Sequence, residues 1–330
     1  LLGRFALPLA LVFHAALVPL SLLPLGGFRL FRCTYVSTHI LLRALPLLFP
    51  LMFAVLLYAL RGRRGPGIFA ALAALAVQLL FCLRIPSLID LSFLFLCDGA
   101  LLIFCARSGW FGLGAKRETP LAAFPIAACM ASVLVYGAGW FARQLAIVRD
   151  PYSYIDNHGY RTVVLRELLQ NAKFLGRGGV GPYSAQHLSR WEGFGMVDLQ
   201  DHVLTLLVHR CGYLALIALV TLLTALLVLA FRRCRRQESM LARLVSYAVL
   251  LSFGAQALAY LLCDLTLLPF SAAAFPLFTF GLRTLLVNMT QLGFLLSTLR
   301  TGSVVRDRDF FTAQARPKRR LRVRFEWEQA

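Results

Sequence analysis

The sequence predicts an all-α polytopic membrane protein with about eight transmembrane helices. Of its 330 residues, 59% are hydrophobic and only 15% are charged. The mean hydropathy is +0.72, and a water-soluble protein with so few charges would expose large apolar patches. Apolar stretches of about 20 residues, the length that crosses a bilayer, also recur along the chain. These observations exclude a soluble domain.

Eight apolar stretches are the expected membrane spans. They lie at residues 5–25, 40–60, 68–85, 87–106, 121–147, 202–231, 240–264 and 284–300. The third and fourth are separated only by Arg84, Ile85 and Pro86, where the proline limits helix continuation. We expect residues 1–315 to form the membrane domain, with one long loop at 149–201 between the fifth and sixth spans. Residues 316–330 form a basic tail.

Lys and Arg residues predict the orientation of the chain. They follow the second, fourth and sixth spans and fill the tail: Arg61, Arg63, Arg64, Arg107, Lys116, Arg117, Arg232, Arg233, Arg235, Arg236, Arg316, Lys318, Arg319, Arg320, Arg322 and Arg324. When eight spans alternate, these segments share one side, which the positive-inside rule assigns to the cytoplasm. Both ends of the sequence are therefore expected in the cytoplasm, and the loop 149–201 on the outer face.

The net charge of +19 is explained by this topology. A polybasic segment beside the membrane is attracted to anionic lipid headgroups, and no nucleic-acid-binding module surrounds the basic tail. We therefore expect contact with membrane lipids and no nucleic-acid partner. The eight cysteines are scattered and form no CxxC pair, so they indicate neither a disulfide framework nor a zinc site. No motif identifies a cofactor or a divalent cation, and whether a divalent cation assists stays open.

The long loop is the expected place for chemistry, because loops of this length between helices are uncommon unless they are functional or disordered. Its apolar-periodic segment 163–175 argues against disorder and predicts an amphipathic helix on the membrane surface. The loop is also rich in aromatic residues and glycine: Tyr152, Tyr154, Gly159, Tyr160, Gly176, Gly178, Gly179, Gly181, Tyr183, Trp191, Gly193, Phe194 and Gly195.

Several segments have the register of known motifs. Residues 275–288, FPLFTFGLRTLLVN, resemble the pattern L-P-F-I-S-Y-G-G-S-S-L-L-x-N, with Leu282 and Arg283 in place of the second Gly and the first Ser. Residues 159–161 and 176–178 reproduce the spacing of a G-Y-Q and a G-K-G segment. Residues 201–212 keep the spacing of a segment that begins with Asp and ends with Gly, and a weaker match places Pro86-Ser87-Leu88 on a Pro-Asp-Leu segment.

These motifs resemble those of the SEDS family (shape, elongation, division and sporulation), the FtsW/RodA/SpoVE-like proteins of bacterial cell-wall synthesis. In this register the chain corresponds to spans three to ten of a ten-helix fold, without the first two. The resemblance implies a multi-pass protein of the bacterial plasma membrane that polymerises lipid II as a peptidoglycan glycosyltransferase, alongside a class B penicillin-binding protein. Whether it serves cell shape, division or sporulation stays open.

The resemblance also implies site residues. Asp201 falls on the essential aspartate of the family, although a carboxylate at a helix start can also cap free N–H groups. Candidate substrate-binding residues are Arg143, Tyr160, Gly176, Arg177 and Gly178. We expect His202 to be an interfacial side chain. The three carboxylates in or at the ends of spans, Asp90, Asp98 and Asp264, are also functional candidates. Two of them have a candidate structural partner, which is Arg84 for Asp90 and Arg283 for Asp264.

The sequence departs from the family pattern where His209 and Arg210 replace two acidic residues before Gly212, which reverses the charge. Leu199 and Gln200 likewise replace His-Thr before the aspartate. Two further hypotheses therefore stand beside the glycosyltransferase. One is a lipid II flippase or transporter of the same architecture, and the other is a catalytically inactive scaffold that binds a transpeptidase.

Overall fold

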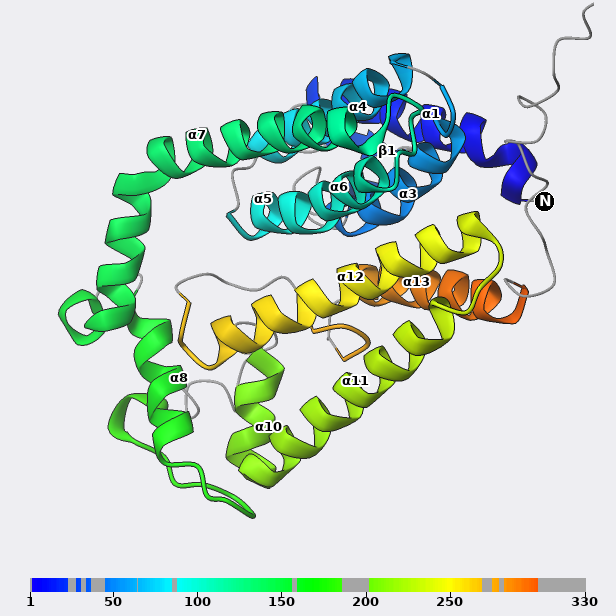
Figure 1. The fold of residues 1–330 in the computed structure, drawn as a ribbon. Helices are drawn as coiled ribbons and strands as arrows, with labels where there is room; N and C mark the ends of the chain where they lie inside the picture. Colours follow the sequence, from blue (N-terminus) through cyan, green and yellow to red (C-terminus); the bar gives the residue numbers. More distant parts are fainter. Residues whose placement is uncertain are drawn as a thin grey trace, which may run out of the picture.

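The computed structural model describes residues 2–22, 28–30, 34–36, 45–63, 65–84, 88–155, 159–185, 202–268, 275–278 and 282–301. Its elements are almost all helical (Figure 1). In chain order they are α1 (Leu2–Leu22), β1 (Phe28–Leu30), β2 (Thr34–Val36), η1 (Leu45–Leu48), α3 (Phe49–Ala59), α4 (Pro66–Arg84), α5 (Leu88–Leu94), η2 (Phe95–Gly99), α6 (Ala100–Arg107), α7 (Ala115–Arg149), η3 (Tyr152–Tyr154), α8 (Tyr160–Gln170), α10 (Val203–Cys211), α11 (Tyr213–Cys234), α12 (Met240–Asp264) and α13 (Leu282–Thr301).

The helical class predicted from composition is confirmed. Helical structure occupies each predicted span, and α5, η2 and α6 follow one another without a gap over the fourth. Four helices, α4, α7, α11 and α12, are long and apolar enough to cross a membrane. The prediction that the sixth span, 202–231, forms one continuous helix was wrong. Gly212 has a φ of 95°, which no residue in a right-handed helix adopts, so the segment divides into α10 and α11.

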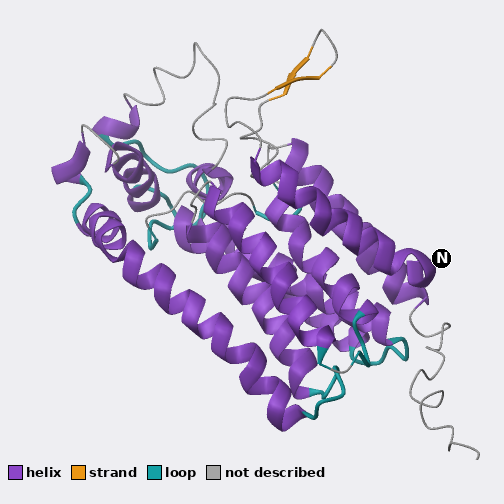
Figure 2. Ribbon diagram, turned by 90° about the horizontal axis from the view of Figure 1, so that it is seen from above, coloured by secondary structure: helices purple, strands orange, loops and turns teal. Residues whose placement is uncertain are grey.

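Two short strands lie outside the helical bundle. β1 and β2 pair antiparallel, with Phe28 opposite Val36 and Leu30 opposite Thr34. Figure 2 shows this hairpin projecting from one end of the bundle. Such a two-stranded ribbon adds little core of its own, so the architecture remains that of a helical bundle.

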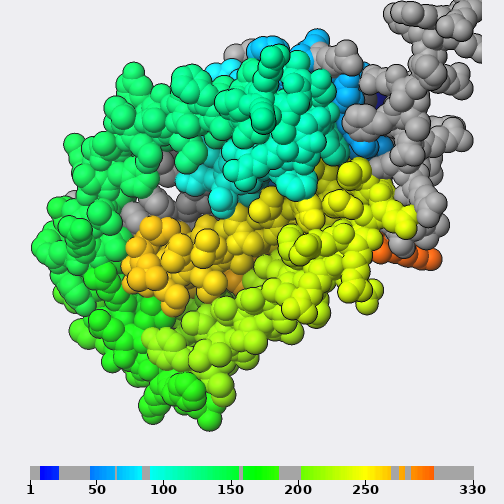
Figure 3. Space-filling model, viewed as in Figure 1, coloured from blue at the N-terminus to red at the C-terminus, as the bar shows by residue number. Residues whose placement is uncertain are grey.

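Helix α12 forms the centre of the bundle. It packs against α3, α5, α6, α10, α11 and α13, and Figure 1 shows it between the layer that contains α3 to α7 and the helices α11 and α13. Phe253 of α12 and Phe53 of α3 are both fully buried in this core. By contrast, more than half of the residues of α7 and α11 are exposed, and most of these exposed residues are apolar, as expected for surfaces in contact with lipid. Figure 3 shows α7, in green, arching along the edge of the molecule.

Polar side chains join α12 to α13 inside the bundle. The hydroxyl oxygens of Ser246 and Thr298 lie 2.8 Å apart, and Gln237 Nε2 donates to the Thr298 carbonyl at 3.0 Å. Farther along, Ser252 Oγ donates to Gln291 Oε1 at 3.3 Å, and the Gln291 amide donates to the Leu47 carbonyl. Hydrophobic burial does not hold helices together in lipid, so side-chain hydrogen bonds of this kind contribute to the association of helices.

Two of the basic connections meet at one end of the bundle. The N–H of Gly62, after α3, donates to the Trp110 carbonyl at 3.0 Å, and Trp110 Nε1 donates to the Leu57 carbonyl at 2.8 Å. The turn after α6 is closed by Glu118, which is fully buried. Its carboxylate accepts three backbone N–H groups, from Phe111, Leu113 and Gly114. The sequence predicts these two connections on one side of the membrane, and in the structure they meet at the same end of the bundle.

Replacement of Glu118 by Ala should destabilise the fold, because three N–H donors would lose their acceptor. We expect a loss of about 2 to 4 kcal/mol of unfolding free energy, measured by thermal or denaturant unfolding of the protein in detergent micelles. Lys116→Ala is the control, since Lys116 lies exposed in the same helical turn and should cost less than about 0.5 kcal/mol. Equal melting temperatures for the two variants would contradict this role.

Candidate functional site

The buried carboxylate of Asp264, at the last residue of α12, holds the start of α10. Asp264 Oδ2 accepts the backbone N–H of Thr205 at 2.7 Å, and Oδ1 lies 2.7 Å from His202 Nδ1. The Thr205 hydroxyl donates to the Asp264 carbonyl at 2.9 Å. All three residues are at least 95% buried. A carboxylate at a helix N-terminus satisfies free N–H groups and interacts favourably with the helix dipole, so Asp264 caps α10 from another helix.

Tyr260, one turn earlier on α12, contributes a second hydrogen bond to the same helix start. Its hydroxyl oxygen accepts the N–H of Val203 at 2.8 Å. Its ring packs edge-on against Phe275, with 5.7 Å between ring centroids, and Phe275 is also buried. The segment 275–288 that carries the family resemblance therefore begins in contact with the residue that fixes α10.

One prediction about these residues is corrected. His202 was expected at the membrane interface, but it is 4% exposed and pairs with Asp264. Its Nδ1 faces the carboxylate, and its Nε2 is buried with no partner among the described residues. The expected pairing of Asp264 with Arg283 stays a prediction, because the side chain of Arg283 lies outside the described part.

Asp201 itself lies outside the described residues, directly before His202 in the sequence. The question of helix capping can still be addressed from α10. His202 is the N-cap residue, and its own side chain makes no capping hydrogen bond. The N–H groups of Val203 and Thr205 already have acceptors on α12. The capping task that the sequence allowed for Asp201 is thus performed, for these two donors, by Tyr260 and Asp264.

The glycine-rich part of the long loop is hydrogen-bonded to the break between α10 and α11. The N–H groups of Gly176 and Gly178 donate to the carbonyls of Cys211 and His209 at 3.1 and 2.8 Å. In return, Tyr213 N–H donates to the Lys173 carbonyl at 3.1 Å. A broken helix leaves unpaired carbonyl and N–H groups on both sides of the break, and this segment supplies partners for several of them.

The geometry explains why two of the predicted site residues are glycines. Gly176 has a φ of 83°, which disfavours residues with a side chain. A Cβ on Gly178 would lie 2.6 Å from the Asn171 carbonyl oxygen and 3.1 Å from His209 Nδ1. Both residues therefore have a structural reason to be glycine, and their role in substrate binding stays a prediction.

The remaining predicted site residues lie on separate elements. Arg177 is exposed between the two glycines and close enough to His209 to influence its charge. Tyr160 begins α8 and is half-buried, whereas Arg143 is exposed on α7, six residues before its end. Helix α7, which carries Arg143, packs against α4, η2 and α6. Gly176 and Gly178, which flank Arg177, are instead hydrogen-bonded to the end of α10.

The predicted helix of the loop is confirmed at Tyr160–Gln170, which is α8. It ends before residue 175, and its apolar side chains are buried: Val163, Val164, Leu165, Leu168 and Leu169. Helix α8 packs against α10, so its apolar face covers protein and not only the membrane surface. The expected surface helix is in this respect corrected.

Glu167, a buried carboxylate on α8, was not among the predicted site residues. It accepts the Ser184 N–H at 2.7 Å. A Cβ on Gly181 would lie 2.6 Å from its Oε2, so Gly181 allows the segment to close over the carboxylate. Its position among the apolar residues of a helical face is the sequence feature that could have indicated a buried carboxylate. Glu167 folds residues 181–185 back onto α8.

His209, which replaces an acidic residue of the family pattern, is 4% exposed in this packing. Burial lowers its pKa, and the positive charge of Arg177 lowers it further. Neither ring nitrogen has a hydrogen-bond partner among the described residues. Burial and the charge of Arg177 therefore disfavour the charged form of His209, whereas Arg210 carries a permanent positive charge at this position.

Another buried carboxylate, Asp98, lies in the π-helical turn η2. It is fully buried, and neither carboxylate oxygen has a hydrogen-bond partner among the described residues. Asp90, at the start of the same helical run, is half-buried and has a partner, whereas the side chain of Arg84 lies outside the described part. Within the described ranges, no three His, Cys, Asp or Glu side chains converge as metal ligands.

Comparison with known proteins finds a similar fold among solved structures. No family model matches the sequence, and no curated protein matches it either. Among solved structures, the fold is similar to a chain from "Structural coordination of polymerization and crosslinking by a peptidoglycan synthase complex", with a TM-score of 0.62. The match covers 92% of this chain and 84% of that chain at 19% identity. The two chains share a helical membrane fold.

Replacement of Asp264 by Ala should release the start of α10. The change removes the acceptor for the Thr205 N–H and for His202 and leaves buried donors unpaired, so we expect a loss of about 3 kcal/mol in unfolding free energy. Asp264→Asn should cost less, because its amide oxygen still accepts one bond. Unfolding in detergent micelles measures both. Equal stability of wild type and Asp264→Ala would refute the capping role.

The lowered pKa of His209 predicts a pH-dependent stability. The unfolded chain binds a proton near the ordinary pKa of 6.5, whereas the folded chain resists it, so the stability contributed by neutral His209 is present above that value and is lost as the pH falls below it. The melting temperature should therefore drop between about pH 7.5 and about pH 5.5, and the drop should be smaller in His209→Gln. Identical pH profiles would contradict this interpretation.

Proposed function

We propose that this chain is a SEDS-type peptidoglycan glycosyltransferase that polymerises lipid II. The observation that carries the proposal is the fold similarity to a chain of a peptidoglycan synthase complex over 92% of the sequence. Two sequence features agree with it: the register of residues 275–288 and the spacing of 201–212. The proposed place of action is the outer face of a bacterial plasma membrane.

In the proposed reaction Asp201 acts as a general base. It would take the proton from the acceptor sugar hydroxyl as that oxygen attacks the anomeric carbon of the donor, and the lipid-linked diphosphate would leave. Arg177 is the proposed cationic contact of the leaving diphosphate, because guanidinium groups bind phosphate oxygens well. Arg143 is a second candidate for this contact. Tyr160, Gly176 and Gly178 are proposed to shape the acceptor side.

The capping arrangement of α10 supports a catalytic role for Asp201 over a structural one. Tyr260 and Asp264 already accept N–H groups in the first turn of α10, so Asp201 is not required for them. Asp264 and Tyr260 are proposed as positioning residues that fix His202, and through it the aspartate before it.

The proposed topology has eight membrane crossings, with both ends of the sequence in the cytoplasm and residues 149–201 outside. The four long apolar helices supply half of these crossings. Helices α1, α3 and α13 and the run from α5 to α6 would supply the others. A class B penicillin-binding protein is the proposed partner, and anionic lipids are expected around the basic cytoplasmic connections.

The test is polymerisation of purified lipid II by the protein reconstituted in vesicles with its penicillin-binding partner. Replacement of Asp201 by Asn should lower the rate at least about 100-fold, because loss of a general base removes a factor of that order. The melting temperature should stay unchanged, since other residues cap α10. Asp150→Asn is the matched control, an exposed carboxylate that begins the same long loop, and it should retain the wild-type rate.

Three results would overturn the proposal. An unchanged polymerisation rate in Asp201→Asn would refute the base assignment. Translocation of lipid II by the wild type without any polymerisation would indicate a transporter. Co-purification with the transpeptidase in the absence of either activity would indicate a scaffold.

A further inference from the structure

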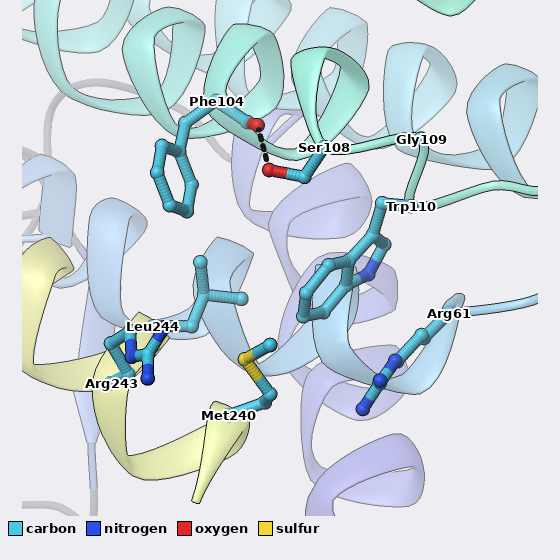
Figure 4. Close-up of a pocket in the computed structure, with 8 residues that line it drawn as sticks. All are labelled: Arg61, Phe104, Ser108, Gly109, Trp110, Met240, Arg243 and Leu244. Carbon is cyan, nitrogen blue, oxygen red and sulfur yellow. Dashed lines mark hydrogen bonds between the residues drawn. The ribbon is translucent and has the colours of Figure 1, made fainter. Parts of the chain in front are cut away.

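Three basic connections converge at one end of the bundle around a cavity of about 210 Å³. The cavity lies between the end of α3, the turn after α6 and the start of α12 (Figure 4). Its lining includes Arg61, Phe104, Trp110, Met240, Arg243 and Leu244. The charged residues that line this cavity are basic and most of its other lining residues are apolar, whereas the site around Asp264 is built on a buried carboxylate.

Two arginines supply the charge of this pocket from different helices. Arg61 lies with its guanidinium carbon 5.0 Å from the centre of the Trp110 ring. Arg243 donates one N–H to the Gln237 carbonyl at 2.8 Å, and its Nε is buried with no acceptor among the described residues. Figure 4 shows Arg61 beside Trp110 on one side and Arg243 below Leu244 on the other. Ring stacking and backbone contact hold both guanidinium groups in place, which suits recognition of a phosphate.

The connections around the cavity carry an excess of positive charge. Residues 61–65, 107–118 and 232–243 contain eleven Lys and Arg but only two Glu residues. Glu118 is fully buried and bonded to three backbone N–H groups of its own turn. Glu238 is exposed. The cavity therefore carries a positive potential that favours an anion.

An aromatic surface leads away from the pocket along the helices. The Phe104 ring lies edge-on to Tyr247, with centroids 5.6 Å apart, and Tyr247 lies 5.6 Å from Phe231. Phe104 and Phe231 are 44% and 46% exposed. An anion with an apolar tail could therefore place its charge between the arginines and its tail against these rings. A free anion would make no use of this surface.

We propose that this pocket binds the phosphate of an anionic phospholipid, with its acyl chains along Phe104, Tyr247 and Phe231. The volume is below the roughly 300 to 1,000 Å³ typical of pockets that enclose whole small molecules, which fits a headgroup and not an entire ligand. Basic pockets between membrane helices are known recognition sites for lipid phosphates. The inference requires that the chain lies in a bilayer and does not depend on the proposed lipid II activity.

The test is lipid retention by the purified full chain in detergent, followed by native mass spectrometry. Phosphatidylglycerol and phosphatidylcholine with the same acyl chains are the two probes. The wild type should retain one phosphatidylglycerol molecule in preference to phosphatidylcholine, and the double variant Arg61→Gln/Arg243→Gln should bind it about tenfold or more weakly. The matched control is Arg232→Gln/Arg236→Gln, which removes two exposed arginines outside the pocket and should keep the preference.

Further arms distinguish the remaining explanations. Arg61→Lys/Arg243→Lys keeps both charges and should retain more binding than the Gln pair, which shows that a loss does not come from misfolding. Glycerol phosphate should not displace the lipid at concentrations comparable to it, and efficient displacement would indicate a site for a free phosphate. Equal losses in the Gln pair and in the control pair would refute the pocket in favour of diffuse surface charge, as would unchanged binding in the Gln pair.

Discussion

The contact between the Asp264 carboxylate and the first turn of α10 is the constraint on which this end of the bundle depends. Helix α12 packs against α3, α5, α6, α11 and α13, so its last residue is a fixed point. By accepting the Thr205 N–H and pairing with His202, Asp264 ties α10 to that point. Helix α8 and the glycine-rich segment then pack on α10, so their positions depend on one buried carboxylate.

The location of the helices could be predicted from the sequence, because apolar length is a local property. The break at Gly212 could not be predicted in this way. Hydropathy continues from residue 202 to 231, and a glycine is tolerated within membrane helices. What allows the break is the set of partners for the exposed carbonyl and N–H groups, and these come from residues 173–178, more than thirty positions earlier in the chain. Such pairings depend on the tertiary fold.

The arrangement of the candidate site likewise depends on tertiary contacts, so the sequence indicates only part of it. Motif spacing pointed to Gly176, Arg177 and Gly178, and this segment packs against the end of α10 near His209. Spacing could not identify Asp264 or Glu167, because a single carboxylate at a helix end or on an apolar helical face has many structural uses. Their partners, His202 and Ser184, are 62 and 17 positions away in the sequence. Only the packed structure shows that each is buried and fully engaged.

The break at Gly212 also decides where the start of α10 lies. An unbroken helix would carry His202 about 15 Å beyond Gly212 along the axis of α11, away from the end of α12. The positive φ of Gly212 instead turns α10 back over the bundle, where it contacts both α8 and α12. His202 is thereby held against α12 by Asp264. The proposed base, Asp201, directly precedes this buried and doubly anchored helix start in the sequence, and catalysis by a group at this place would require such a rigid support.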